Sequence, residues 1–149
     1  MATSATVRFG FAWEATQHDP CDRRWNLFHH VLTGDLLVEV GAVDLSARFG
    51  WVPLLNVAVQ FEGIERRLAD EHGFASLEFT ESEDRLDFTR RDRRIRISAT
   101  YVDTAAEVPA DRMRSELRRF RSWAAEEARR RHPCLARRPE FASQFEDCG

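Results

Sequence analysis

Four side chains in the first part of the chain have the chemistry of a metal site. His18 and Cys21 flank the dipeptide Asp19-Pro20, and a pair of imidazoles follows at His29 and His30. Imidazole nitrogens and thiolates suit zinc, and a loop that folds back would bring His18, Cys21 and one histidine of the pair together. The spacing matches no standard zinc pattern, however, and a second cysteine pair is missing. We therefore predict no bound metal or cofactor, and interpret these residues as a loop histidine, a half-buried thiol, and one buried and one exposed imidazole.

Arginines form the second set of residues that could do chemistry. All 22 basic residues of the chain are Arg, and residues 109–139 hold 10 of them against 4 acidic residues. Guanidinium groups bind phosphate, but here they surround a predicted helix and the rest of the chain is acidic, which would repel a nucleic acid. The sequence therefore disfavours nucleic acid and leaves two interpretations of the basic helix open: it packs near the acidic body of the chain, or it meets an acidic partner protein. The helix arginines predicted to bind it are Arg118, Arg119, Arg121, Arg129 and Arg130.

No arrangement of residues in the sequence predicts catalysis. Cys134 follows His132-Pro133, but a catalytic thiol and its base meet through the fold and not through adjacency. The 3 cysteines are odd in number and widely spaced, which is typical of free thiols in a cytosolic protein. The carboxylates Asp103, Glu107 and Asp111 lie in a predicted solvated connector. We therefore expect no catalytic residues and a protein that is not an enzyme.

Aromatic side chains leave one alternative open. The chain holds 4 Trp, 11 Phe and 1 Tyr, and most are expected in the core because burying an aromatic ring contributes strongly to stability. Phe9, Phe11, Trp13 and Tyr101 would instead line a pocket if the sheet curves away from its helices. The alternative function is therefore a small ligand-binding protein or enzyme that uses a sheet-lined aromatic pocket.

The elements that must position these residues are clearest between Phe74 and Val102. Three segments there alternate apolar with polar residues, as expected for strands whose successive side chains point to opposite faces. The pattern predicts a three-strand antiparallel meander that is apolar on one face and charged on the other. The apolar residues are Ala75, Leu77 and Phe79 in the first strand, Leu86 and Phe88 in the second, and Ile95, Ile97, Ala99 and Tyr101 in the third.

The two turns of this meander differ in how well they fix the pairing. A two-residue loop at Arg91-Asp92 pairs Phe88 with Ile95, which also sets acidic against basic residues on the solvated face. The first turn accepts a loop of four or of two residues, and the sequence leaves both registers open. The two registers place Phe79 opposite Leu86, or Glu78 opposite Arg85.

Before the meander, the pattern predicts further strands. Residues 7–13 form a first strand, and residues 36–47 form a hairpin that turns at Gly41-Ala42 and pairs Val40 with Val43. Residues 23–32 fit a helix or a strand. We favour the strand, because the segment is rich in aromatic and branched residues and leads directly into a sheet.

Two segments have the spacing of helices. Pro53 opens the first, whose apolar face runs from Leu54 to Leu68, with a strand over residues 56–61 as the competing interpretation. The second covers residues 111–132 and ends at Pro133. Its apolar stripe contains Met113, Leu117, Phe120, Ala124 and Ala128. Residues 135–149 are predicted to be an irregular tail.

These elements predict an α+β fold with an antiparallel sheet of about six strands and two main helices packed on one face. At 149 residues the chain is expected to form a single domain over residues 1–149, long enough to bury its own core. No apolar run approaches the ~20 residues that a membrane span requires, and residues 1–4 lack the pattern of a secretory signal. We therefore expect no membrane partner and a cytoplasmic location.

The run Gly34–Val40 (GDLLVEV), followed by Phe49–Leu55 (FGWVPLL), resembles uncharacterised small α+β proteins of GC-rich bacteria. Their general build is similar to that of the immunity proteins of polymorphic toxin systems. The resemblance implies a fold and a mode of action, which is binding rather than turnover. It does not identify any residue of a functional site. We therefore expect a non-enzymatic protein-interaction module, immunity-like or regulatory, whose partner is another protein. The sequence leaves open whether the chain also forms a homodimer.

Overall fold

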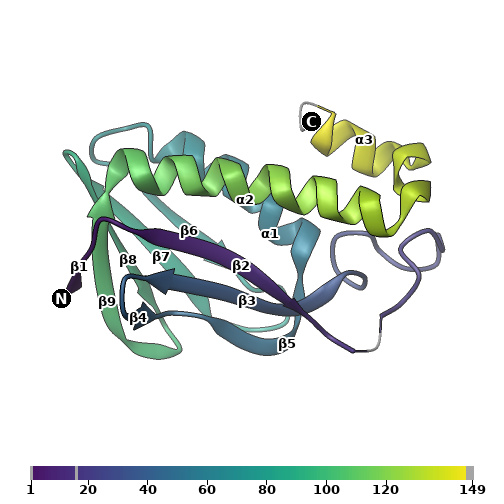
Figure 1. The fold of residues 1–149 in the computed structure, drawn as a ribbon, viewed down its shortest axis with the longest axis horizontal. Helices are drawn as coiled ribbons and strands as arrows, with labels where there is room; N and C mark the ends of the chain where they lie inside the picture. Colours follow the sequence, from purple (N-terminus) through teal and green to yellow (C-terminus); the bar gives the residue numbers. More distant parts are fainter. Residues whose placement is uncertain (1, 16, 147–149) are drawn as a thin grey trace.

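Residues 2–15 and 17–146, which the computed structural model describes, form two β-sheets, three α-helices and one short 3-10 helix (Figure 1). The five-stranded sheet has the order β1-β9-β8-β7-β6 and is antiparallel, except that β1 runs parallel to β9. The four-stranded sheet is built on β3, which pairs antiparallel with β2, β4 and β5. The strands are β1 (Ala2–Thr3), β2 (Val7–Trp13), β3 (Thr33–Val40), β4 (Val43–Asp44), β5 (Ala47–Pro53), β6 (Phe74–Glu78), β7 (Arg85–Arg91), β8 (Arg94–Ala99) and β9 (Val102–Pro109).

The helices form where apolar residues recur every three or four positions. α1 (Leu54–Arg67) buries the predicted apolar face, so the competing interpretation of residues 56–61 as a strand is wrong. α2 (Ala110–Arg131) buries the whole predicted stripe. Each of these helices follows a proline, and the 3-10 helix η1 (Pro133–Arg137) and α3 (Pro139–Phe145) come after α2.

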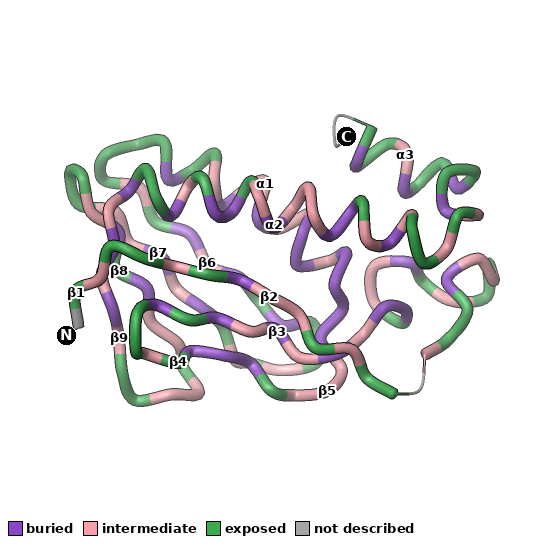
Figure 2. The backbone as a smooth tube through the Cα atoms, in the orientation of Figure 1, coloured by how far each residue is buried: buried purple, intermediate pink, exposed green. Residues whose placement is uncertain are grey.

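One hydrophobic cluster joins both sheets and the helices, and its buried residues lie on the inner side of each element (Figure 2). α1 packs beside β6, α2 packs beside β2, and the two helices contact one another. At their junction the ring of Phe9 lies 4.9 Å from that of Phe61 and 6.2 Å from that of Phe120, and the last two are 5.3 Å apart. Such ring pairs contribute about 0.5–1.5 kcal/mol each beyond the burial of their area. The three aromatic rings therefore hold β2, α1 and α2 together.

A charged pair on α2 covers the free edge of β2. Phe9 has its backbone N–H and C=O on the side of β2 that faces away from β3, where an edge strand leaves such groups unpaired. The N–H donates to Oε2 of Glu116 over 2.7 Å, and the C=O accepts from Nη2 of Arg119 over 2.7 Å. Arg119 also donates to both carboxylate oxygens of Glu116, at 2.6 and 2.7 Å. Glu116 is only 8% exposed, so the pair closes this part of the edge to water.

Gln60 of α1 does the same at the edge of β6. Its side-chain amide accepts from the N–H of Glu78 over 2.9 Å and donates to the C=O of Glu78 over 2.8 Å. The amide thus makes the two hydrogen bonds that a neighbouring strand would make at this residue. The two main helices therefore satisfy the neighbouring sheet edges at one residue each: α2 at Phe9 and α1 at Glu78.

The α+β class is confirmed, but the single sheet of about six strands is wrong. Two segments that were not predicted as strands are strands: residues 47–53, of which only Ala47 belonged to the predicted hairpin, form β5, and residues 102–109, which hold Asp103 and Glu107 of the predicted connector, form β9. β5 interrupts its alternation with Gly50, which has a φ of +79°, and in β9 two consecutive polar residues, Asp103 and Thr104, follow Val102. In both segments the period-two signal is too short to indicate a strand.

The turn between β7 and β8 differs from the predicted one by a slide of two residues. Phe88 lies opposite Ile97, not Ile95, and the ladder closes at Arg91 and Arg94. Asp92 takes a left-handed φ of +55°, a conformation that Asp tolerates better than most residues. The turn therefore forms one residue later than predicted. A slide of two keeps every side chain on its predicted face.

The other hairpins follow predicted registers. Val40 pairs with Val43, as expected, and Gly41 supplies the positive φ of +58° that the turn needs. Of the two registers left open for the first turn of the meander, the chain adopts the one with Glu78 opposite Arg85. In this register, unlike the alternative, acidic Glu78 faces a basic residue.

Residues 17–32 form turns, so the strand favoured for residues 23–32 is wrong, as is the helix. The reason is local side-chain chemistry. Oδ1 of Asp19, Asp22 and Asn26 each accepts a backbone N–H two residues further along, at 2.9, 3.0 and 2.9 Å. These Asx turns bend the chain repeatedly and compete with both regular structures. The buried residues of the segment nevertheless join the core: Leu27, Val31 and Leu32.

The tail is also more ordered than predicted, since residues 133–145 form η1 and α3 instead of an irregular segment. Phe141 and Phe145 are buried there. Cys134 is joined to Cys21 by a disulfide, with Cα atoms 6.1 Å apart, so the expectation of free thiols is wrong for this pair. Buried Arg138 donates to the carbonyl of Pro20 over 2.8 Å. The fold thus brings together two segments that are distant in sequence, which spacing alone does not reveal.

Candidate functional site

The four candidate metal ligands do not converge in the structure. His18 stacks on Trp25 with ring centroids 3.8 Å apart, and the rings of His29 and His30 are 6.3 Å apart. Cys21 is occupied by its disulfide to Cys134. Within residues 2–15 and 17–146, no group of three or more His, Cys, Asp and Glu side chains is placed to hold a metal ion. That the protein binds no metal stays a prediction.

The five arginines of α2 predicted to bind a partner contact this chain itself. Arg118 pairs with Glu65, Arg119 with Glu116, Arg121 with Glu62 and Arg130 with Glu127, while Arg129 donates to the carbonyl of Phe145. The guanidinium groups of Arg121 and Arg129 also lie over the rings of Phe145 and Phe141, which fastens α3 to α2. The hydrogen bonds to Glu116 raise the pKa of Arg119 above its usual value. Their role in binding another protein stays a prediction.

Two of the aromatic residues considered for a pocket are packed into the protein. Phe9 is buried in the core. Tyr101 packs edge-on against Phe49 and Phe79, and its hydroxyl donates to the carbonyl of Leu45 over 2.8 Å. Burial raises the pKa of Tyr101 well above its usual range, and the charges of nearby aspartates add to the shift. The hydrogen bond from the Tyr101 hydroxyl to Leu45 therefore links the two sheets.

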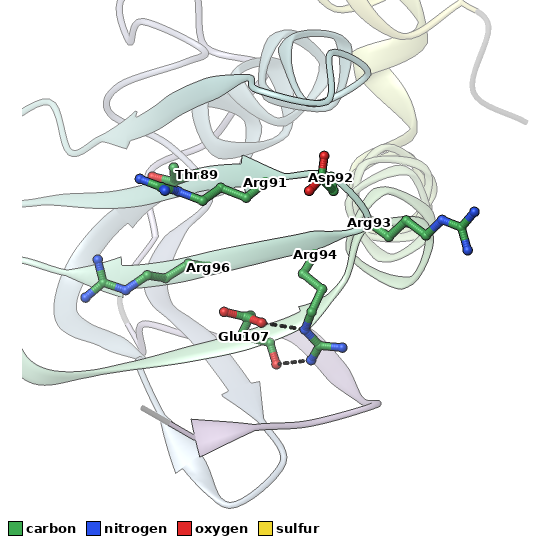
Figure 3. A pocket seen from close by; sticks show the side chains of 7 residues that line it. All are labelled: Thr89, Arg91, Asp92, Arg93, Arg94, Arg96 and Glu107. Atoms are coloured by element: carbon green, nitrogen blue, oxygen red, sulfur yellow. Dashed lines mark hydrogen bonds and ion pairs between the residues drawn. The ribbon is translucent and has the colours of Figure 1, made fainter.

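A groove rich in arginine lies on the outer face of the five-stranded sheet, at the β7–β8 turn (Figure 3). Its volume is about 730 Å³. The side chains that line it come from β7, the turn, β8 and β9: Thr89, Arg91, Asp92, Arg93, Arg94, Arg96 and Glu107. We call it the arginine groove. Alternation places these residues here, because buried Ile95 and Ile97 on β8 force Arg94 and Arg96 to the opposite face.

The four arginines of the groove differ in their partners. Arg94 donates through Nε to Oε1 of Glu107 over 2.5 Å. Arg91, Arg93 and Arg96 are exposed, and among the described residues none of their guanidinium groups has a hydrogen bond or an ion pair. Figure 3 shows Arg91 and Arg96 extending in the same direction along neighbouring strands, while Arg93 points away. The groove therefore presents positive charge that the chain itself does not neutralise.

An exposed aromatic ring lies beside this groove. Phe74 is 56% exposed, and no other large hydrophobic residue among those described is comparably exposed. In the ladder Phe74 is opposite Thr89, Thr89 is opposite Arg96, and Arg96 is opposite Glu107. Residues directly opposite one another share a face. Phe74 and the arginine groove thus form one continuous surface across four strands.

The same sheet face is acidic at its other end. Glu78, Glu81 and Glu83 are exposed around the β6–β7 turn, and none has an ion-pair partner among the described residues. β7 connects the two ends and is 7 residues long, which corresponds to about 20 Å. Separate charges of opposite sign at this distance make the outer face a dipole, which orients an approaching charged partner.

This arrangement has the chemistry of recognition. Unpaired guanidinium groups donate forked hydrogen bonds to carboxylates or phosphates, and an exposed ring beside them offers apolar contact. Arg and aromatic residues are also the types that contribute most at protein interfaces. The sequence pattern identified the charged face of the meander, with Arg94 and Arg96 on it. It did not identify which arginines lack partners, because Glu107 lies on a strand that was not predicted.

Comparison of the chain with family models, with curated proteins and with solved structures finds no match in any of the three. The helices within residues 2–15 and 17–146 are too short or too polar to cross a membrane.

Proposed function

We propose that this chain is a non-enzymatic interaction module that binds an acidic surface of a partner protein through the arginine groove and Phe74. One observation carries the proposal. Arg91 and Arg96, which have no partner among the described residues, lie on the same sheet face as the exposed ring of Phe74, and Arg93, likewise without one, extends from the adjoining turn (Figure 3). Most other arginines are paired within the chain, including all five on α2 that were considered first.

A protein fits this surface better than a nucleic acid does. The groove is lined by four arginines and two acidic residues, which leaves a modest positive charge. A nucleic acid strand that extended along the sheet would reach Glu78 and Glu83 about 20 Å away, and its phosphates would be repelled there. A folded protein with an acidic patch of limited size, flanked by basic residues, complements both ends of the face.

The proposal agrees with the resemblance of residues 34–40 and 49–55 to proteins whose general build is similar to that of immunity proteins, a resemblance that implies binding rather than turnover. In this proposal the chain binds its partner stoichiometrically, as an immunity-like or regulatory protein. It requires no metal, no cofactor and no catalytic residue.

The test compares the wild-type protein with the variant Arg91→Glu/Arg96→Glu, which reverses the charge of two arginines in the groove. Each form is used to capture proteins from a lysate of the source cells, and the captured proteins are quantified. The protein that the variant loses is then purified, and its association with each form is measured at two ionic strengths. We expect the variant to associate at least about tenfold more slowly, with a smaller difference at high salt, because exposed charges act mainly on the encounter.

The matched control is Arg8→Glu/Arg137→Glu, which changes the net charge equally at two exposed arginines outside the groove. It should associate almost as fast as the wild type. An equal loss in both variants would show that only net charge matters. Binding that disappears on nuclease treatment, or turnover of a substrate by the purified protein, would overturn the proposal.

A further inference from the structure

β6 is an edge strand with backbone groups that no other strand satisfies. It pairs only with β7, and the hydrogen bonds at Gly73 and Phe79 fix which residues face that neighbour. The alternate residues Phe74, Ser76 and Glu78 therefore point their N–H and C=O groups away from the sheet. Gln60 satisfies those of Glu78. Those of Phe74 and Ser76 have no hydrogen-bond partner within the described part of the chain.

A groove of about 410 Å³ lies along this edge, between β6 and α1. We call it the edge groove. Ile64, Gly63 and Arg67 line it from α1, and Phe74 and Ser76 line it from β6. The space beside Gly63 is open, since a Cβ at this position would have no heavy atom within 4 Å. Arg67 is exposed and has no ion-pair partner among the residues that the structure describes.

We propose that an extended segment of the partner protein adds to β6 in the edge groove. This inference rests on the proposed function and specifies its recognition mode, which is strand addition. The segment pairs with the outward N–H and C=O groups of Phe74 and Ser76. It thereby continues along β6 the hydrogen bonds that the Gln60 amide makes at Glu78. One apolar side chain of the segment packs on Phe74 and Ile64, and a carboxylate pairs with Arg67.

Charge and space both favour this occupant. Phe74 lines the edge groove and lies opposite Thr89, which lines the arginine groove, so an acidic protein bound to the second is placed to insert a segment into the first. A single strand needs only the strand spacing of about 4.8 Å beside β6. A second copy of this chain would bring its own α1 along its own β6, and both helices would then compete for the same groove.

The probe is a displayed library of short random peptides, selected on the wild-type protein. We expect the selected peptides to carry an acidic residue and an apolar residue in alternating, strand-like positions. On binding, the amide protons of Phe74 and Ser76 should exchange more slowly with solvent, because they become hydrogen-bonded. Recovery of no binding peptide, or binding that leaves both amides unprotected, would overturn the inference.

Gly63 offers a matched pair of variants. Gly63→Ala adds one methyl group to open space and should bind the peptides as the wild type does. Gly63→Trp fills the edge groove and should weaken binding at least about tenfold, which corresponds to about 1.4 kcal/mol. Equal binding by the two variants would contradict strand addition. Should Gly63→Trp still bind the full partner while Arg91→Glu/Arg96→Glu does not, strand addition fails and the proposed function stands.

Discussion

Removal of the Glu116 carboxylate should destabilise the fold more than removal of any exposed acid of α2. Glu116 is 8% exposed and accepts the N–H of Phe9 as well as two hydrogen bonds from Arg119. In Glu116→Ala the N–H of Phe9 loses its partner, which costs about 1–3 kcal/mol. Arg119 loses its counter-charge as well. Because the Arg119 side chain is 35% exposed, water partly solvates its freed guanidinium, so the total loss should lie at the low end of the range of about 3–5 kcal/mol that breaking a fully buried pair costs.

Two further variants separate shape from charge. Glu116→Gln keeps an oxygen for the N–H of Phe9 but loses the charge that Arg119 needs, so it should cost about 1–2 kcal/mol. Glu126→Ala removes an exposed acid of the same helix that has no ion-pair partner among the described residues, and it should change stability by no more than about 0.5 kcal/mol. Urea unfolding gives all three values, with the midpoint shifting at constant slope. If Glu116→Ala is as stable as Glu126→Ala, the charged pair does not secure the edge of β2.

Three other predictions concern the remaining contacts. The single tyrosine, Tyr101, has a raised pKa in the folded protein, so its contribution to stability is complete below pH ~10 and is lost as the pH rises further. Tyrosinate absorbance should therefore appear at higher pH in the native protein than in guanidinium, and coincident titrations would refute the burial of the phenol. Reduction of the Cys21–Cys134 disulfide, which spans 113 residues, should lower stability by about 4–5 kcal/mol in the chain-entropy model. A proteolytic digest of the non-reduced protein that lacks the peptide pair joined through Cys21 and Cys134 would contradict the presence of this disulfide. Charge reversal at Arg121, which is hydrogen-bonded to the carbonyl of Gln144 and paired with Glu62, should lower the melting temperature through a loss of about 2 kcal/mol without slowing partner association. The opposite pattern would favour a binding role for this arginine.

The sequence predicted those elements whose signals are long and local. Helices α1 and α2 were found because apolar residues such as Phe61 and Leu117 recur at the helical period over many turns. The charged face of the meander was also found, because alternation alone decides which face a strand residue occupies. Even the wrong register at the β7–β8 turn kept these faces, since the slide was of two residues.

What the sequence did not predict depends on contacts between distant segments. Cys21 and Cys134 meet only because the turns of residues 17–32 fold onto η1. The sequence left open whether the arginines of α2 pack on the acidic body or bind a partner, because acidic residues such as Glu65 on α1 lie far away in sequence. Conversely, the arginines around the β7–β8 turn were not predicted as a site. The structure pairs Arg94 with Glu107 of β9 and thereby distinguishes it from Arg91, Arg93 and Arg96, which have no partner among the described residues.

The most direct test of the central claim observes the arginine side chains themselves. The Nε–H groups of arginine give separate signals in a nitrogen-edited nuclear magnetic resonance spectrum, and single Arg→Gln variants assign them. On titration with the purified partner, we predict that the signals of Arg91 and Arg96 shift, while those of Arg118 and Arg119 keep their positions. A shift confined to the arginines of α2, with Arg91 and Arg96 unchanged, would contradict the account and place the interface on the helix.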